Sequence, residues 1–461
     1  MHQGRRSALG GAASALEEIL ACTGLERGVF ATKVDVETPR VDQGGIDVAC
    51  AAIRQERYMK INGEAIKTWD PISGLYCTGD ARHIQLHCNF PHHRKLALEV
   101  LGIDESASVT REEVETAMAR EKDVFDLEDR LFQAGACAAA VRTPEEWDAH
   151  PQQAAIAELP LIEFETVECK HEDIKQAAQA RLDAWMERRD PHAASASGLR
   201  CLDLTRVLAG PIAGRSMADL GASVMRVSGP GRPYIPMLSI LTGPGKQTCE
   251  IDLETKQGRE SLEELLKTTD VFFNAYRRGS LTKHGLDSAS IAARHPGIIV
   301  IEIDAYSRKG PWAGKRGFDS LVQCASGLAH AHSVALGQRE TVSHLPVQLL
   351  DYVTGYLATF AGITARLDQV ATQDPSSRIV RLSLARTAQW LRDQGVKDAG
   401  QAWEMAQDVP ASMIESEFVE RTTPDGAKAT ILGFPWTTEP ASKAGLGHVI
   451  EAIGSGPARW L

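Results

Sequence analysis

The sequence has no Cys-x-x-Cys pair, no long apolar run and no excess of basic residues, and each absence excludes a class of protein. Its nine cysteines are scattered along the chain, which indicates a reduced, intracellular protein rather than a disulfide-stabilised secreted one. No apolar run approaches the roughly 20 residues that cross a membrane as a helix. The net charge of −11 argues against nucleic acid as a partner, because nucleic-acid-binding proteins present a basic face. We therefore expect a chain that binds neither a membrane nor nucleic acid.

Three kinds of catalytic or binding motif are also missing. No G-x-S-x-G elbow is present, so an α/β-hydrolase would lack its nucleophile. Lys246 lies in a glycine-containing stretch, but the spacing does not fit a P-loop, and Gln247 stands where serine or threonine is needed. Histidine and cysteine cluster at residues 87, 88, 92 and 93, but all four fall at one hairpin–helix junction, a spacing that suits no standard zinc site. We therefore expect no metal site.

The N-terminus only partly resembles a targeting signal. Arg5 and Arg6 precede an apolar stretch, as in a secretory signal, but Glu17 and Glu18 end that stretch too early. We therefore expect a cytoplasmic protein, with a mitochondrial presequence as the alternative.

The length of 461 residues favours two domains. In the second half, short apolar runs alternate with helical patterns, as is typical of parallel strands that are buried on both faces. The predicted fold class is therefore α/β, with a Rossmann-like, doubly wound large domain. The expected strands are residues 201–204, 222–227, 248–253, 271–275 and 297–303, and the expected helices are residues 212–220, 255–268 and 287–295.

The first half has a pattern typical of a smaller α+β domain. Residues 74–88 predict a β-hairpin, and Thr110 and Thr143 each begin a capping box. A helix over 7–22 and a strand over 30–36 repeat the layout of a helix after Asp351 and a strand over 378–384, which indicates a partial internal duplication. The expected organisation is this partial repeat and small-domain-like half in residues 1–186, a polar linker in 187–198, and the large domain in 199–461.

Several motifs of the second half follow one another in a distinctive order. They are residues 202–211 (LDLTRVLAGP) with 218–224 (ADLGASV), 245–253 (GKQTCEIDL), 274–279 (NAYRRG) with 284–286 (HGL), 317–319 (GFD) with Gln323, and Asp351 with Gly355. Together they resemble the class III CoA-transferase family, which includes formyl-CoA transferase, carnitine CoA-transferase and the α-methylacyl-CoA racemases. The resemblance implies the family's fold in a rearranged order, because the part similar to its small domain comes first. It also implies an interlocked homodimer. The alternative is that, in the rearranged order, one chain supplies the parts of the site that two chains normally share.

The resemblance implies a role for Asp351. The family's nucleophile is an aspartate in an Asp-x-x-x-Gly setting at the start of a helix, which Asp351 and Gly355 match. Such an enzyme moves CoA between an acyl-CoA thioester and a carboxylic acid through an aspartyl mixed anhydride and an enzyme–CoA thioester. CoA or acyl-CoA is then a substrate, and no tightly bound cofactor is needed. The helix N-terminus is expected to keep the carboxylate ionised; the alternative is that Asp351 simply caps this helix.

The resemblance also implies where the substrates lie. Leu208 stands where formyl-CoA transferases have glutamine, so one polar contact is missing. Arg232, Lys283 and Arg316 are candidates for the CoA contacts, the alternative for each being an exposed surface charge. The implied CoA-binding residues are Leu208, Ala209, Arg232, Ile251, Ser280, Lys283 and Arg316, and the implied substrate-pocket residues are Phe318, Asp319, Gln323 and Gly355.

Two other functions stay open. One is a different acyl-CoA reaction on the same site, such as isomerisation, lyase chemistry or racemisation. Racemases carry a His-Asp pair where this chain has Phe318 and Asp319, so racemisation would need another base, such as His330 or His332. The other is a degenerate, non-catalytic CoA-binding protein, which Leu208 and the lack of a clear match to the glycine-rich loop of formyl-CoA transferases favour.

Overall fold

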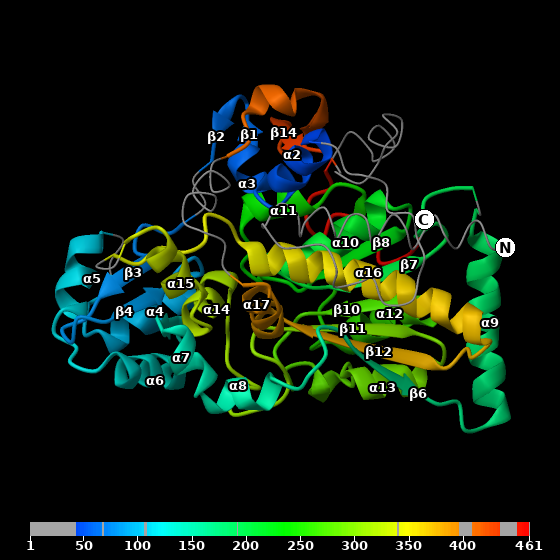
Figure 1. Cartoon of the computed structure of the whole chain (residues 1–461). Coiled ribbons are helices and arrows are strands. Elements are labelled where there is room, and N and C mark those ends of the chain that lie inside the picture. The colour runs from blue at the N-terminus through cyan, green and yellow to red at the C-terminus, as the bar shows by residue number, and fades with distance from the viewer. Residues whose placement is uncertain are drawn as a thin grey trace.

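The computed structural model describes residues 43–66, 69–105, 108–190, 192–338, 341–395, 408–433 and 450–460, and of residues 43–47 the backbone alone. The predicted helix over 7–22 and strand over 30–36 lie outside the described residues, and with them the proposed duplication. The described part contains three sheets. Figure 1 shows a large unit around the longest of them, with two smaller units packed beside it.

The largest sheet has seven strands in the order β6-β12-β11-β10-β7-β8-β9. Neighbouring strands are parallel except for β6 and β12, which are antiparallel. Starting from β7, the chain adds β8 and β9 on one side and then β10, β11 and β12 on the other, which is the doubly wound order. The α/β prediction is therefore confirmed. The strands are β6 (Glu163–Val167), β7 (Arg200–Leu204), β8 (Ser223–Ser228), β9 (Lys246–Glu250), β10 (Val271–Asn274), β11 (Ile299–Asp304) and β12 (Ser377–Ser383).

Helices cover both faces of this sheet. Because side chains alternate along a strand, Phe273 packs on the side of α10, α16 and α17, whereas Phe272 packs on the side of α12 and α13. Both faces are thus buried, which explains the continuous apolar runs of the strands. In the described part of the chain no helix is long and apolar enough to cross a membrane. The helices are α10 (Ala209–Asp219), α12 (Lys256–Lys267), α13 (Ser288–Arg294), α16 (Leu349–Thr372) and α17 (Leu384–Asp393).

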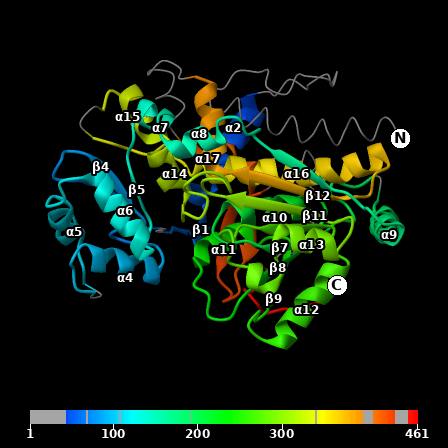
Figure 2. The same ribbon diagram turned by 90° about the horizontal axis from the view of Figure 1, so that it is seen from below.

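A smaller α+β unit comes from the first half. The strands β3 (Gly74–Cys77), β4 (His83–Leu86) and β5 (Ala138–Ala140) form an antiparallel sheet that packs on α4 (Pro91–Val100), α5 (Arg111–Met118) and α6 (Val124–Ala134). The predicted hairpin is confirmed, and so are both capping boxes, at the starts of α5 and α7 (Pro144–Asp148). Figure 2 shows this unit to one side of the seven-stranded sheet.

The third sheet pairs strands from near the beginning of the described chain with strands from its last part. Its order is β13-β14-β1-β2, and Lys60 of β1 lies opposite Thr430 of β14. In the same way β6 and α9 (Glu172–Arg188), which begin before residue 187, pack in the large unit. The predicted linker also contacts this unit, because the N–H of Ala196 donates to the carbonyl of Leu220 (2.9 Å). The first part of the chain therefore supplies strands to all three sheets. The other elements are α2 (Gln43–Ala52), α3 (Gln55–Tyr58), β1 (Lys60–Ile61), β2 (Glu64–Ala65), α8 (Pro151–Ile156), α11 (Pro236–Thr242), η1 (Thr282–His284), α14 (Asp319–Ala325), α15 (Leu328–Ala335), η2 (Ala411–Met413), η3 (Glu415–Glu417), β13 (Phe418–Thr422) and β14 (Lys428–Leu432).

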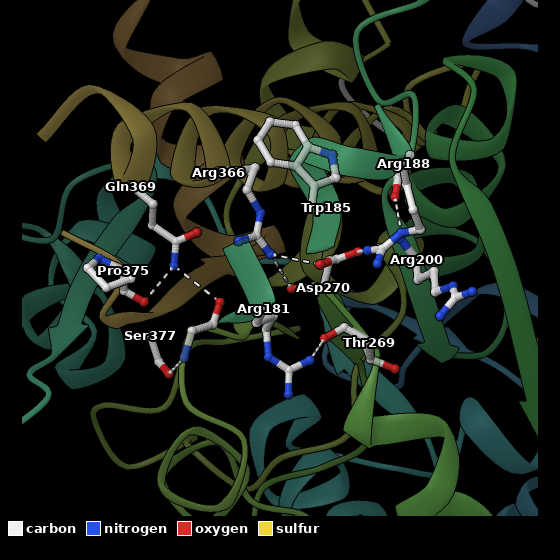
Figure 3. A network of polar contacts seen from close by, with 12 residues as sticks. Arg181, Trp185, Arg188, Arg200, Thr269, Asp270, Arg366, Gln369, Pro375 and Ser377 are labelled. Atoms are coloured by element: carbon white, nitrogen blue, oxygen red, sulfur yellow. Dashed lines mark hydrogen bonds and ion pairs between the residues drawn. The ribbon is translucent and has the colours of Figure 1, made fainter. Parts of the chain in front are cut away.

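A buried ion network fixes α9 and α16 to the amino-terminal edge of the large sheet (Figure 3). Asp270 immediately precedes β10, and its side chain is 0% exposed. It accepts hydrogen bonds from Arg188 of α9 (2.6 Å) and from Arg366 of α16 (3.2 Å). Arg181 of α9 donates to the carbonyl of Thr269 nearby. One carboxylate thus compensates two arginines from two helices, at the end of the sheet opposite to the carboxyl ends of the strands.

Candidate active site

A cavity of about 720 Å³ lies at the carboxyl ends of the parallel strands. It is lined by the loops that follow β7, β8, β9, β10 and β11, the place where doubly wound sheets bind their ligands. The small α+β unit supplies a further wall, with Phe90, His92 and His93. The cavity is therefore built from both halves of the chain.

Asp351 lies in the first turn of α16, on the wall of this cavity, and is 8% exposed. The N-cap of α16 is Gln348, so the alternative that Asp351 is the helix cap is wrong. The backbone N–H of Ala209 donates a hydrogen bond to the carboxylate of Asp351. Because Ala209 is the first residue of α10, the N-terminal ends of two helices meet at this carboxyl group.

Gly355 lies behind the cavity wall rather than in it. Here α16 crosses α10, and a Cβ atom on Gly355 would lie 2.6 Å from the carbonyl oxygen of Ala209 and 2.9 Å from Cγ2 of Ile212. These distances are shorter than ordinary van der Waals contacts. The glycine therefore allows the close approach of the two helices that brings Ala209 to Asp351.

Gly355→Ala is expected to destabilise the fold by roughly 1–3 kcal/mol, since the added methyl group pushes α16 away from α10. The same displacement separates Asp351 from the N–H of Ala209. Urea unfolding measures the loss of stability. Gly314→Ala is the matched control, because nothing lies within 4 Å of a Cβ atom there. Equal stability of the two variants would contradict this account of the packing.

Asp319 and Gln323 also lie outside the cavity, beneath the start of α16. Asp319 is 0% exposed, and its Oδ2 accepts the backbone N–H of Asp351 (2.9 Å). The amide of Gln323 donates to Oδ1 of Asp319. The same side chain binds the backbone of Leu345 (2.8 Å) and Val347 (3.0 Å) in the loop before α16. Both residues therefore hold the chain that carries Asp351 and do not reach the space for a substrate.

Three carboxyl groups gather around the first turn of α16, and one of them, Glu56 of α3, was not predicted. Glu56 accepts a hydrogen bond from the hydroxyl of Tyr352 (2.6 Å). Burial, followed by the charges of Asp319 and Glu56, raises the pKa of Asp351 well above its usual range. The hydrogen bond from Ala209 acts in the opposite direction and lowers the pKa. Burial also raises the pKa of Asp319 to about 7. The expectation that the helix N-terminus keeps Asp351 ionised is therefore wrong, because burial and like charges outweigh the N–H groups.

Arginines line the middle of the cavity. Arg206, Arg232, Arg277 and Arg316 all lie on its wall, and within the described ranges none of the four forms an ion pair with a carboxylate. Arg277 and Arg316 lie close together, since burial and then the charge of Arg316 lower the pKa of Arg277. This arrangement favours an anionic ligand, because guanidinium groups bind phosphate strongly. Arg232 and Arg316 were predicted, whereas Arg206 and Arg277, although they lie within the quoted motifs, were not.

The other predicted CoA contacts also lie on this wall. They are Leu208, Ala209, Ile251, Ser280 and Lys283. Lys283 is already paired with Glu254 (2.5 Å), at the exposed mouth of the cavity. Lys315 was not predicted, lines the same wall, and binds Glu128 of the small unit (3.0 Å). The small unit thus holds the loop that leads to Phe318.

Aromatic rings and imidazoles also line the cavity, beside Arg206 and Arg316. Phe318 stacks on His87, with ring centroids 3.8 Å apart and an angle of 7° between the planes. His330 and His332, the bases considered for racemisation, do not line the cavity, whereas His92 and His93 do. Burial lowers the pKa of His93 to about 3, so this imidazole is neutral. Where side chains are described, no group of three potential metal ligands is found.

Comparison with known proteins gives the same family as the sequence motifs. Residues 196–417 match the model of CoA-transferase family III. A probable fatty acyl-CoA transferase of Mycobacterium tuberculosis is 31% identical over 183 residues, which cover 37% of this chain and 46% of the relative. Succinate–glutarate CoA-transferase of Agrobacterium fabrum is 36% identical over 150 residues, which cover 29% of this chain and 38% of the relative.

The solved structures add a weaker likeness. The crystal structure of a hypothetical protein from Mycobacterium tuberculosis is 28% identical and has a TM-score of 0.39, with 44% of this chain and 57% of that chain covered. The chain therefore spans between a third and a half of the length of the curated relatives named above. The matched residues contain the seven positions predicted to contact CoA, Phe318 and Asp351.

Proposed function

Residues 196–417 belong to CoA-transferase family III, and on that premise we propose that the protein transfers CoA from an acyl-CoA thioester to a carboxylic acid, with Asp351 as the nucleophile. The observation that carries the proposal is the position of Asp351. Its carboxyl group lies on the wall of the arginine-lined cavity and receives the N–H of Ala209. An anionic CoA chain along the arginines would lead its thioester toward this carboxyl group.

The proposed reaction begins with the loss of the proton from Asp351. The carboxylate attacks the donor thioester, which gives a mixed anhydride and CoA thiolate. The thiolate attacks the aspartyl carbonyl, releases the donor acid and leaves an aspartyl–CoA thioester. The acceptor carboxylate then reverses these two steps, and the product is a new acyl-CoA. The N–H of Ala209 is suited to stabilise the negative oxygen that forms at the aspartyl carbonyl in these steps.

An exchange assay tests this proposal. Succinyl-CoA as donor and glutarate as acceptor are a reasonable first pair, because one relative is named for these acids. The products are detected by chromatography. A new acyl-CoA that forms only when the acid is added would support transfer. Release of free CoA without any acceptor-dependent product, across a panel of donors and acids, would contradict it.

A second candidate function is proton exchange at the carbon next to the thioester. It is favoured by one observation, namely that His92 and His93 line the same cavity as Asp351. Incubation of acyl-CoA in deuterated water, once with and once without an acceptor acid, separates the two. Incorporation of deuterium without transfer would favour this reaction, whereas transfer without incorporation would favour the first.

Arg277→Ala is expected to weaken CoA binding by about 10- to 100-fold, because a charge-assisted hydrogen bond contributes roughly 1.5–3 kcal/mol. Arg277 is suited to this test because it takes part in none of the described ion pairs, so its loss should leave the fold intact. Isothermal titration with free CoA measures the change. Arg120→Ala, which removes an exposed arginine of the small unit, is the control. Unchanged affinity in Arg277→Ala would place the CoA phosphates elsewhere.

We further propose that the protein is a homodimer, as the resemblance implies. Analytical ultracentrifugation tests this directly. An active monomer would instead mean that the rearranged chain completes its own site.

A further inference from the structure

Glu56 and Asp319 both accept hydrogen bonds from the first turn of α16. Oε2 of Glu56 accepts the hydroxyl of Tyr352, which is 296 positions later in the chain (2.6 Å). Oδ2 of Asp319 accepts a hydrogen bond from the backbone N–H of Asp351 (2.9 Å). The first turn of α16 is therefore held by two carboxylates, one from α14 and one from α3 in the first part of the chain.

Neither flanking carboxylate hydrogen-bonds the carboxyl group of Asp351, so each acts on it through charge and through the position of the turn. We propose that Glu56 is a positioning residue that controls the protonation of Asp351, so that the first part of the chain sets the reactivity of the site. This inference rests on the proposed function. It adds a group that lies outside the segment matched by the family model, which begins at residue 196.

The charges that face Glu56 compensate its own charge only in part: Arg57 lowers the pKa of Glu56, and Asp408 raises it. Arg57, on the same helix, is already paired with Asp408 (2.8 Å). Tyr352 and Tyr356 face it from α16, and Arg215 of α10 lies behind them, bound to Gln55 (2.7 Å) and to the carbonyl of Leu432 (2.8 Å). Within the described ranges no basic side chain forms an ion pair with Glu56. Its negative charge therefore acts on Asp351, together with that of Asp319.

The direction of the effect follows from the sign of this charge. A nearby negative charge disfavours the ionised form of Asp351 and raises its pKa. Burial raises the pKa of Glu56 itself, and the hydroxyl of Tyr352 opposes that rise. Glu56→Gln removes the charge but keeps the size of the side chain, so the pKa of Asp351 should fall.

Esterification by a water-soluble diazoacetamide tests the effect of Glu56 on the ionisation of Asp351 and does not require CoA. The reagent takes the proton of a carboxylic acid, and the carboxylate then displaces nitrogen to form an ester, so the rate at Asp351 falls as the group ionises. Peptide mass spectrometry measures the rate at Asp351 as a function of pH. In Glu56→Gln the midpoint of this fall is expected at a lower pH than in the natural chain. The alkaline rise of transfer activity should move in the same direction.

Two variants control the experiment. Asp408→Asn removes a negative charge from the same region, but Asp408 faces Arg54 (3.7 Å) and Arg57 (2.8 Å) rather than Asp351, so no downward shift is expected. Glu56→Asp keeps the charge, so the midpoint of the esterification rate at Asp351 should be the same as in the natural chain. If Glu56→Gln does not fold, Tyr352→Phe serves instead, because the loss of its hydroxyl leaves Glu56 more often neutral and lowers the midpoint.

The outcomes for Glu56 and for the proposed function are distinct. An unmoved midpoint in Glu56→Gln, or an equal shift in Asp408→Asn, would overturn the role of Glu56 even if CoA transfer is observed. A shifted midpoint in a protein that never transfers CoA would support Glu56 as the controlling charge and count against the transferase.

Discussion

Asp351→Asn is expected to reduce CoA transfer by about 10⁶-fold, a loss of the size seen when a covalent nucleophile is removed. The amide keeps the shape of the side chain but cannot attack a thioester. It also removes a group whose pKa is raised by burial, so the packing of α16 should not suffer. Steady-state kinetics with the donor and acceptor acids measure the effect.

Binding separates this loss of chemistry from a loss of structure. The affinity for free CoA should be unchanged in Asp351→Asn, because the arginines that line the cavity are untouched. Asp304→Asn is the matched control, since Asp304 is another carboxyl group on the same wall with no part in the proposed reaction. A variant Asp351→Asn that transfers CoA at the natural rate would remove Asp351 from the mechanism.

Asp270→Asn is expected to destabilise the fold by about 3–5 kcal/mol, the usual effect of breaking a buried ion pair. The substitution leaves Arg188 and Arg366 without their counter-charge, and the side chain of Arg366 is only 1% exposed. Two further nitrogen atoms of Arg366, Nε and Nη1, are already buried without a hydrogen-bond partner. The midpoint of urea unfolding measures the loss.

The control for Asp270 is an exposed ion pair. Asp126 binds Arg130 one turn later on α6 (2.8 Å), and its side chain is 64% exposed, so Asp126→Asn should change stability by less than about 1 kcal/mol. CoA affinity of folded Asp270→Asn should be normal, because the network lies at the opposite edge of the sheet from the cavity. Equal stability of the two variants would mean that α9 and α16 are held by their apolar contacts alone.

The sequence predicted the large sheet well because strands buried on both faces leave an unambiguous apolar run. Residues 271–275 and 297–303 became β10 and β11 with small changes at their ends. Local turn chemistry was equally informative, as the boxes at Thr110 and Thr143 show. What the sequence did not predict were the pairings between distant segments, such as β1 with β14, because a two-residue strand has no period of its own.

The same distinction, between what short motifs predict and what contacts of distant segments decide, applies to the candidate site. The motifs placed Asp351, Phe318 and the seven CoA positions around one cavity. They also placed Asp319, Gln323 and Gly355 in the substrate pocket, whereas these residues support α16 from behind. Glu56 gave no signal, since it lies in a short polar segment and meets Tyr352 only through the folding of the whole chain. The pKa of Asp351 depends on the same contacts, and for that reason its direction was predicted wrongly.

The most direct test of the account is the mass of the protein after brief incubation with an acyl-CoA donor and no acceptor. The account predicts a covalent adduct equal to CoA less one water, on the peptide that contains Asp351, which is lost on addition of hydroxylamine and absent in Asp351→Asn. An adduct on another residue, or transfer of CoA without any adduct at Asp351, would contradict it.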